Sequence, residues 1–135
     1  MLYEWKDAYS VGYDDIDNEH RIFIKLSIRF QEMNIATDKQ IIARYLDELE
    51  KYAEFHFLSE ENRMIDVDYP QLAEHIKQHR NLLEELSEKK SRILSGKLPV
   101  TALVPFLLEW FVKHTTGNDQ KFVSFMKSKN RWPVY

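Results

Sequence analysis

Two histidines stand one helical turn apart in the segment HIKQH, at positions 75 and 79. Residues four apart in an α-helix lie on the same face, with Cβ atoms about 5–6 Å apart. Two imidazoles placed in this way can bind one metal ion, because neutral imidazole is a common ligand of zinc, copper, iron and nickel. A pair on an exposed helix face has no such role. The rest of the sequence must therefore decide between a metal site and a surface pair.

The other three histidines are spread along the chain in a way that favours a shared site. His20, His56 and His114 each fall in a different segment with helical periodicity, so every predicted helix carries at least one imidazole. Ligands of a site inside a helical bundle must come from facing helices. Five buried imidazoles without a metal would leave many polar groups unpaired in an apolar core. This distribution favours a metal site.

Two carboxylates accompany the histidines. Glu60 follows His56 by four residues and shares its helix face, which selects Glu60 rather than Glu61 as the inward acid. Asp119 follows His114 by five residues, which in an α-helix is about 140° away. Either the two side chains flank the direction of the core, or the helix is locally widened into a π turn near the glycine between them. Seven ligands are too many for one octahedral ion, but two ions bridged by carboxylates can use them all.

Four segments with helical periodicity are predicted to carry these residues. Apolar side chains recur at intervals of three and four, no segment alternates as a strand does, and the chain has no internal repeat. Because the connections are short, neighbouring helices should be antiparallel, which predicts an all-α, up-down-up-down four-helix bundle in one domain. The predicted segments are an arm at 1–16, helices at about 17–34, 38–64, 69–95 and 101–127, and a tail at 128–135.

Capping residues mark the ends of the predicted helices. Thr37 or Asp38 can accept the free amide hydrogens at the start of the second helix. Asp68 can cap the third helix, which would place Pro70 in its first turn, and Gly96 suits a left-handed C-terminal cap. The arm and the tail are too aromatic to stay free of the bundle. The residues expected to pack on it are Tyr3, Trp5, Tyr9, Val11 and the tail segment RWPVY.

Composition narrows the class of protein. A length of 135 residues suits one domain, and 44% hydrophobic with 30% charged residues argues against a disordered chain or a membrane protein. A formal net charge of -3 gives no reason to expect a nucleic acid partner. The absence of cysteine excludes disulfides and thiolate ligands, so nitrogen and oxygen must hold any metal. The start, MLYEWKDAYS, lacks a secretory signal pattern, and the run ALVPFLLEWFV is too short to span a bilayer, so we expect a cytoplasmic protein.

Taken together, these motifs resemble the hemerythrin family, in particular its single-domain bacterial members. The matching pieces span nearly the whole chain: Trp5 and SVGYDDID before His20, the segments HFLSEE, MIDVDYP and HIKQH, and Trp110 through His114 to Asp119. The resemblance implies two iron ions in a diiron centre bridged by an oxo or hydroxo group. It also implies that the interval of five residues from His114 to Asp119 is the one that the family uses. In this interpretation His75, His79 and His114 hold one iron, His20 and His56 hold the other, and Glu60 and Asp119 bridge them.

The resemblance further implies reversible O2 binding that serves storage, delivery or sensing. An iron with only two imidazoles has an open position for O2, whereas its neighbour is saturated by three. Thr115, followed by Thr116, stands where hemerythrins usually carry a branched apolar residue, so its hydroxyl could bind O2 or admit water. The residues expected to line the O2 pocket are Phe23, Phe57, Trp110, Phe111 and Thr115.

Two other functions stay open on the sequence. One is a diiron redox enzyme acting on peroxide or nitric oxide. Ferritin-like oxidases use Glu-x-x-His motifs, however, and no histidine here has a glutamate three residues before it, which favours binding over oxidation. The other is an oxygen-dependent signalling module that acts on a separate protein. We expect a monomer or a weak homo-oligomer, and the sequence does not identify a protein partner.

Overall fold

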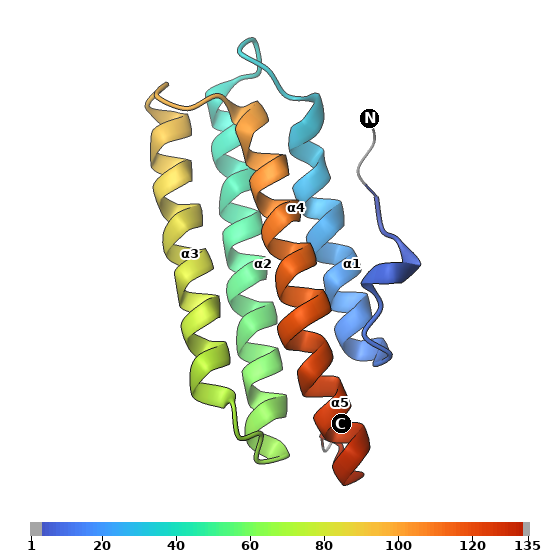
Figure 1. The fold of residues 1–135 in the computed structure, drawn as a ribbon. Helices are drawn as coiled ribbons and strands as arrows, with labels where there is room; N and C mark the ends of the chain where they lie inside the picture. Colours follow the sequence, from blue (N-terminus) through green and yellow to red (C-terminus); the bar gives the residue numbers. More distant parts are fainter. Residues whose placement is uncertain (1–3, 134–135) are drawn as a thin grey trace.

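Four long helices form a bundle in which each helix runs antiparallel to the one before it in the chain (Figure 1). The computed structural model describes residues 4–133, and within that range it contains no strand. The fourth helix is continuous, but a π-helical segment divides it into two α-helical parts. This architecture confirms the all-α, up-down-up-down bundle expected from the sequence. The elements are η1 (Asp7–Tyr9), α1 (Asp14–Ile28), η2 (Arg29–Glu32), α2 (Lys39–Asp66), α3 (Leu72–Leu94), η3 (Val100–Ala102), α4 (Leu103–His114), η4 (Thr115–Asp119) and α5 (Gln120–Lys129).

Local interactions explain where α2 and α3 begin and end. Asp38 caps α2, since its side chain accepts a hydrogen bond of 2.7 Å from the backbone N–H of Gln40. Thr37 instead accepts a bond of 3.0 Å from the N–H of Asn34 in the preceding turn. Gly96 has a φ of +77°, the left-handed conformation expected after the end of α3. Asp38 as the cap of α2, rather than Thr37, and Gly96 as the C-terminal cap of α3 are therefore confirmed.

The turn between α2 and α3 differs from the sequence prediction. Asp68 does not cap α3, and Pro70 is not in its first turn, because α3 begins at Leu72. Asp68 has a φ of +55°, and the N–H of Tyr69 donates to the carbonyl of Met64 at 2.9 Å. This is the hydrogen-bond pattern of a helix C-terminus that ends in a left-handed residue. Asp68 thus ends α2 rather than starting α3.

The apolar core is divided into two clusters along the bundle axis. The larger cluster fills the half that contains the α1–α2 and α3–α4 connections and includes Phe30, Leu46, Leu86 and Leu103. The smaller cluster fills the other half, around Ile16, Met64, Phe122 and Met126 at its centre. In each helix, the candidate ligands lie where the residues of one cluster give way to those of the other. The polar site is therefore a layer enclosed by apolar packing on both sides.

The arm and the tail pack on the bundle as expected, within the described residues. Trp5 meets Tyr9 edge to face with 5.7 Å between ring centroids, and Tyr9 meets Phe111 of α4 in the same way at 5.6 Å. In the tail, Trp132 stacks on Tyr13 at 5.9 Å. The arm thus packs on Phe111 of α4, and the tail packs on the residue just before α1. Three residues of the prediction, Tyr3, Val134 and Tyr135, lie outside the described residues.

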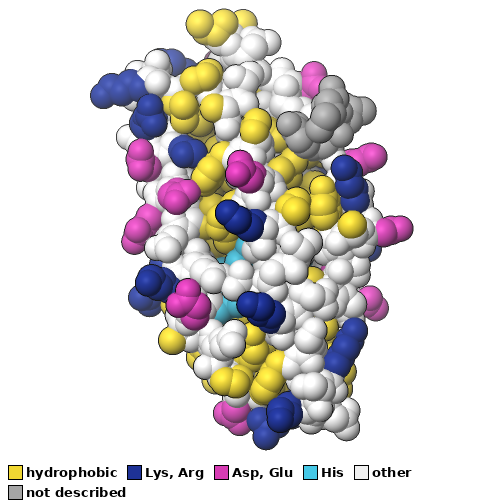
Figure 2. All heavy atoms as spheres, viewed as in Figure 1, with side chains coloured by type: hydrophobic (Ala, Val, Ile, Leu, Met, Phe, Trp, Pro, Cys, Tyr) yellow, Lys and Arg dark blue, Asp and Glu magenta, His cyan; other side chains and the backbone are white. Residues whose placement is uncertain are grey.

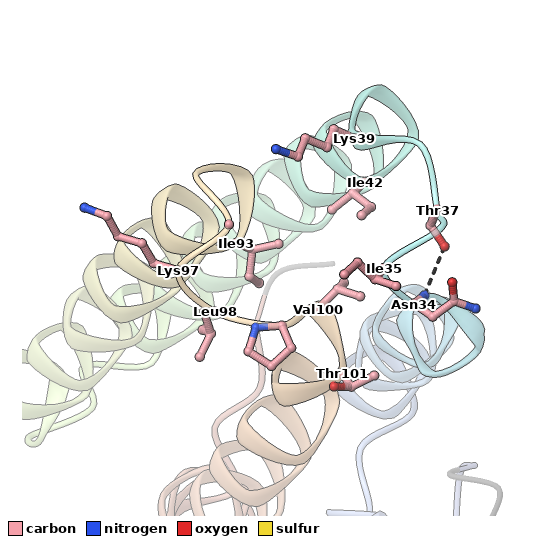
Figure 3. Close-up of a pocket in the computed structure, with 12 residues that line it drawn as sticks. Asn34, Ile35, Thr37, Lys39, Ile42, Ile93, Lys97, Leu98, Val100 and Thr101 are labelled. Atoms are coloured by element: carbon pink, nitrogen blue, oxygen red, sulfur yellow. Dashed lines mark hydrogen bonds between the residues drawn. The ribbon is translucent and has the colours of Figure 1, made fainter.

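The surface shows little of the histidine layer. Lys, Arg, Asp and Glu side chains are scattered over the face in Figure 2, and only small areas of histidine reach it. Within residues 4–133, no helix combines the length and the hydrophobicity that a bilayer span requires. A cavity of about 380 Å³ lies between the α1–α2 and α3–α4 connections, lined among others by Ile42, Ile93 and Val100 (Figure 3). It shares no lining residue with the histidine layer.

Candidate metal centre

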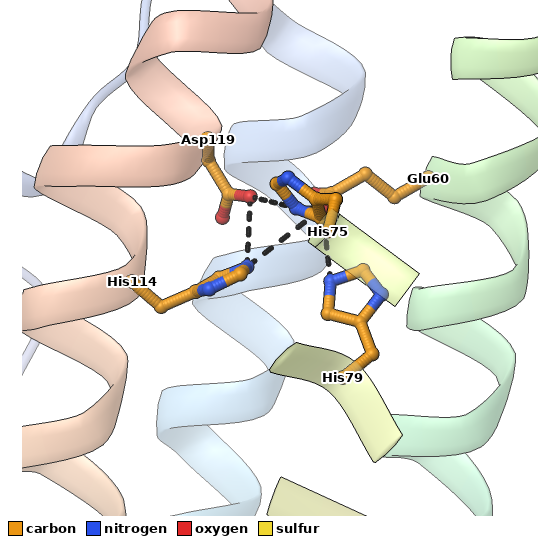
Figure 4. Close-up of side chains that lie close together, drawn as sticks. All are labelled: Glu60, His75, His79, His114 and Asp119. Carbon is orange, nitrogen blue, oxygen red and sulfur yellow. Dashed lines mark hydrogen bonds and ion pairs between the residues drawn. The ribbon is translucent and has the colours of Figure 1, made fainter. Parts of the chain in front are cut away.

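The seven predicted ligands converge at one level of the bundle. Five of them are drawn in Figure 4, where two imidazoles from α3 face Glu60 of α2 and the pair His114 and Asp119 of the fourth helix. None of the seven is more than 6% exposed, so they form a site that is closed to bulk solvent. The buried residues are His20, His56, Glu60, His75, His79, His114 and Asp119.

The donor atoms fall into two groups that share a carboxylate. In each group, the imidazole nitrogens and carboxylate oxygens lie within 4.8 Å of one another, a spacing that suits a common metal ion. One group has three imidazoles and the other has two, as the sequence interpretation requires. The first group is Glu60, His75, His79, His114 and Asp119, and the second is His20, His56 and Glu60.

Glu60 divides its two oxygens between the groups. Its Oε1 lies 2.7 Å from Nε2 of His75 and 3.2 Å from Nε2 of His79. Its Oε2 faces the other group, at 3.6 Å from Nε2 of His56 and 3.9 Å from Nε2 of His20. A carboxylate in this orientation can bind one cation with each oxygen.

Asp119 divides its oxygens in the same way. Oδ1 lies 3.0 Å from Nε2 of His75 and 3.1 Å from Nε2 of His114, whereas Oδ2 lies 3.2 Å from Nε2 of His20. The π-helical turn η4 makes this possible, because a wider turn brings residues five apart to one face. Of the two explanations considered for the interval between His114 and Asp119, the widened helix is confirmed.

Carboxylates outside the two groups set the tautomers of two imidazoles. Nδ1 of His56 lies 2.7 Å from Oε1 of Glu19, and Nδ1 of His79 lies 2.8 Å from Oε2 of Glu61. A proton on each Nδ1 donates to the carboxylate, which leaves the lone pair of Nε2 directed into the cluster.

Sequence reasoning missed Glu19, and it set Glu61 aside as the acid that does not point inward. The side chain of Glu61 indeed lies outside the cluster, but it is only 19% exposed and is bound to His79, a role that the sequence analysis did not assign to it. The sequence signal for Glu61 was its position directly after Glu60, which places it on the flank of α2 that faces α3. The signal for Glu19 was weaker, since it consists only of its position directly before the ligand candidate His20.

The electrostatics of the cluster are those of tightly paired opposite charges. Burial acts to lower the pKa of His75, but its hydrogen bonds to the carboxylates of Asp119 and Glu60 outweigh burial and raise it to about 9. Burial likewise opposes the effect of Asp119 and Glu60 on His114, whose pKa rises to about 10. Burial acts to raise the pKa of both acids, yet the surrounding imidazoles hold each below its ordinary value. Both carboxylates therefore stay ionised at neutral pH.

Unpaired atoms within the cluster show that its residues fit a cation. Oε2 of Glu60, Oδ2 of Asp119 and Nε2 of both His79 and His114 are buried without a hydrogen-bond partner. Buried polar atoms normally have partners, and four orphans in one cluster require an explanation. Inward lone pairs of imidazole and carboxylate repel each other unless a positive charge lies between them. Five imidazoles and two carboxylates are a ligand set that suits iron and other first-row transition metals.

The predicted pocket residues surround a small buried cavity on the two-imidazole side. Its volume is about 10 Å³, close to the smallest space that admits one water-sized molecule. Three of the aromatic walls also pack on imidazoles: Phe57 stacks on His79 at 3.9 Å and Trp110 on His114 at 4.5 Å, while Phe111 meets His20 edge to face at 5.1 Å. The lining residues are Phe23, Phe57, Trp110, Phe111 and Thr115 together with His20, His56, His114 and Asp119.

Comparison with known proteins agrees with this geometry. The profile of the hemerythrin family, described as the Hemerythrin HHE cation binding domain, matches residues 11–126. The chain belongs to the hemerythrin family. A bacteriohemerythrin of Stenotrophomonas maltophilia is 27% identical over 127 residues, which cover 94% of this chain and 83% of that protein. A myohemerythrin of Riftia pachyptila is 32% identical over 121 residues, covering 89% of this chain and 90% of that protein.

The fold is shared with a solved hemerythrin. A crystal structure of wild-type hemerythrin superposes with a TM-score of 0.82 at 22% sequence identity, covering 92% of this chain and 97% of the other. At this level of identity the similarity concerns the arrangement of the helices. The candidate metal ligands of the present chain are identified instead from the placement of its own side chains.

Proposed function

We propose that this protein binds O2 reversibly at a non-haem diiron centre. The observation that carries the proposal is the division of two buried carboxylates, Glu60 and Asp119, between a group of three imidazoles and a group of two. His75, His79 and His114 would hold one iron, His20 and His56 the other, and both carboxylates would bridge. When bound, the iron pair supplies the two electrons and the open coordination position that O2 binding needs.

The protein's own residues account for reversibility in this proposal. Glu19 and Glu61 hold His56 and His79 in the tautomer that presents Nε2 to the metal. The aromatic walls exclude water, so O2 is held in a dry site where protons are scarce. The volume of the cavity also limits the ligand, because about 10 Å³ is close to the smallest space that admits one water-sized molecule and leaves no room for an organic substrate. Binding of a small gas is thus the activity that the site supports best.

The proposal is tested by metal content and a visible spectrum. The purified protein should contain about two irons per chain. After reduction without oxygen, admission of air should produce a visible absorption band that disappears when the oxygen is removed. Zinc, or no metal, would contradict the proposal. Two irons with immediate and irreversible oxidation would favour instead a redox reaction with peroxide or nitric oxide.

Thr115 is expected to control how long the oxygenated protein lasts. Its side chain lines the cavity, is 1% exposed, and its Oγ1 has no hydrogen-bond partner. An unpaired buried hydroxyl costs about 1–3 kcal/mol and attracts water. Thr115→Val keeps the shape and removes the hydroxyl, so we expect a slower oxidation by air, by several-fold, and a slightly higher melting temperature. The rate is measured from the decay of the oxygenated spectrum.

Thr116→Val is the matched control for this substitution. Thr116 is exposed, and its Oγ1 donates a bond of 2.7 Å to the carbonyl of Val112, away from the cavity. Its substitution should leave the decay rate unchanged. Faster decay in Thr115→Val would mean that the hydroxyl stabilises bound O2 rather than admitting water.

A further inference from the structure

A buried arginine stands behind one of the five imidazoles. Arg63 of α2 is 4% exposed, and its Nη2 donates a hydrogen bond of 2.9 Å to Oε2 of Glu19. The other oxygen of this carboxylate, Oε1, accepts the bond of 2.7 Å from Nδ1 of His56. Ser59 also donates to Oε2 at 3.3 Å, and the hydroxyl of Tyr52 donates to the backbone carbonyl of Glu19 at 2.7 Å. His56, Glu19 and Arg63 thus form a connected chain that leads away from the metal centre.

The corresponding chain behind His79 has no cation. Nδ1 of His79 is bound to Glu61 at 2.8 Å, and among residues 4–133 no Lys or Arg forms an ion pair with that carboxylate. Each of the two groups therefore has one imidazole whose Nδ1 is bound to a carboxylate outside the cluster. Within the described part of the chain, only the outer carboxylate of the two-imidazole group, Glu19, forms an ion pair with a cation. The two proposed irons differ in their surroundings as well as in their number of imidazoles.

Stability alone gives a poor account of Arg63. Its Nε and Nη1 are buried without hydrogen-bond partners, and each such group carries a desolvation cost. A buried ion pair is often no more stabilising than apolar side chains of the same volume. An apolar residue at this position, next to the core residue Met64, would remove these two orphans, and Glu19 would then be the only group that needs a cation there. The position of the Arg63 guanidinium is therefore better explained by an effect on the metal centre, through Glu19 and His56.

We propose that Arg63 is a positioning residue which, through Glu19, sets how strongly His56 donates to the iron of the two-imidazole group. A carboxylate bound to Nδ1–H raises the basicity of a ligand imidazole. A guanidinium on the same carboxylate withdraws part of its negative charge and moderates that effect. His56 is therefore a weaker donor than it would be with Glu19 alone, which favours the ferrous state that binds O2. This inference rests on the proposed diiron function.

The test is to remove the charge of Arg63 while keeping most of its volume. In iron-loaded Arg63→Met protein, Glu19 becomes a buried carboxylate without a counter-charge and draws the Nδ1 proton of His56 more strongly. We expect a lower midpoint potential than in the wild type, and oxidation of the oxygenated protein that is roughly tenfold faster, the scale on which such outer partners act. Both are compared at equal iron content. A lower melting temperature with an unchanged potential would overturn the inference and leave Arg63 a structural residue.

Three further variants separate this route from a general electrostatic effect. Arg63→Lys keeps the charge and should restore most of the wild-type potential. Glu19→Gln should raise the potential, because an amide accepts the proton of His56 more weakly than a carboxylate. In the Glu19→Gln background, Arg63→Met should then change the potential far less than it does alone, since the connecting carboxylate is gone. Equal shifts in both backgrounds would overturn the inference, because Arg63 would then act directly through space.

A measurement without iron distinguishes failure of this inference from failure of the proposed function. In the metal-free protein, nitrogen-15 NMR should show His56 with its proton on Nδ1, and Arg63→Met should move that proton to lower field as the bond to Glu19 strengthens. A wild type that holds no iron would refute the diiron proposal while this shift could still be observed. A wild type that holds two irons, with no change in the proton shift or the potential on substitution, would refute the inference alone.

Discussion

Replacing Glu60 by alanine is expected to abolish iron binding in both groups. Glu60 is fully buried, and its two oxygens face His75 and His79 on one side and His20 and His56 on the other. Its loss removes one ligand from each iron and a negative charge that offsets both cations. We expect the affinity for iron to fall roughly 100-fold or more. Residues that only hydrogen-bond to a metal ligand change metal affinity by about 10–100-fold, and loss of a ligand itself should have at least the larger effect. Metal analysis after purification should then find far less than one iron per chain.

A control on the same helix distinguishes loss of the ligand from damage to the helix. Glu54 of α2 is exposed and forms an ion pair with Lys51 at 3.7 Å, so Glu54→Ala should retain two irons. Glu60→Gln keeps the volume of the side chain and checks that any loss does not come from a cavity. Circular dichroism of the metal-free variants verifies that the bundle persists. Two irons in folded Glu60→Ala protein would exclude Glu60 as a bridge and with it the proposed arrangement of the centre.

Periodicity and residue type were sufficient to predict the bundle and the residues that meet at its centre. His56 and Glu60, and likewise His75 and His79, lie four apart on long regular helices, so helix geometry places each pair on one face. The antiparallel order follows from short connections, whose capping residues Asp38 and Gly96 are local signals. These features depend on interactions within one turn of helix, which the sequence displays directly.

The interval between His114 and Asp119 could be identified as an anomaly but not resolved from spacing. An α-helix separates the two side chains by about 140°, and only a π turn brings them together. Whether the helix widens depends on two free energies. One is the cost of the π turn, and the other is the gain from the interactions that both side chains make across the bundle. That balance is a tertiary property, and the resemblance to a family rather than the residue pattern supplied the answer.

The carboxylates behind the imidazoles could not be predicted for a related reason. Glu19, Glu61 and Arg63 are charged residues on helix flanks, where the usual expectation is solvent. Their partners lie 18 or more residues away in the sequence, on a different helix, so no short-range pattern marks them. Asp68 shows the same limit at a turn, since its left-handed conformation follows from how α2 ends. The sequence predicts the ligands better than the residues that orient them.

Removing the metal is expected to give the protein an unusual dependence of stability on pH. In the metal-free cluster, the pKa of His75 is raised to about 9 and that of His114 to about 10, from an ordinary value of 6.5, by the carboxylates of Asp119 and Glu60 that outweigh burial. A group whose pKa is raised on folding stabilises the folded state fully below its unfolded pKa and loses that contribution as the pH rises through the folded value. The melting temperature of the stripped protein should therefore fall between pH 6.5 and 9, by on the order of 10 °C.

The acidic limit follows from the same ion pairs, with the opposite sign. The pKa values of Glu60 and Asp119 are lowered on folding, because the imidazoles outweigh burial, so their stabilisation is present above their ordinary values of 4.5 and 3.8 and is lost below them. The stripped protein should thus be most stable between about pH 4.5 and 6.5. His114→Asn, which removes one raised group, should make the decline above pH 6.5 shallower.

Iron should remove this decline in stability above neutral pH. Imidazole binds a metal only when neutral, so loading must displace protons from His75 and His114, and affinity should keep rising until the pH approaches their raised pKa values. Because a ligand stabilises the folded state in proportion to the logarithm of its affinity, the difference in melting temperature between loaded and stripped protein should widen from pH 6.5 to 9. Acidification below about pH 6 should release the iron. Parallel thermal denaturation of both forms measures this difference, and curves that stay equally far apart would mean that His75 and His114 are already neutral in the stripped protein.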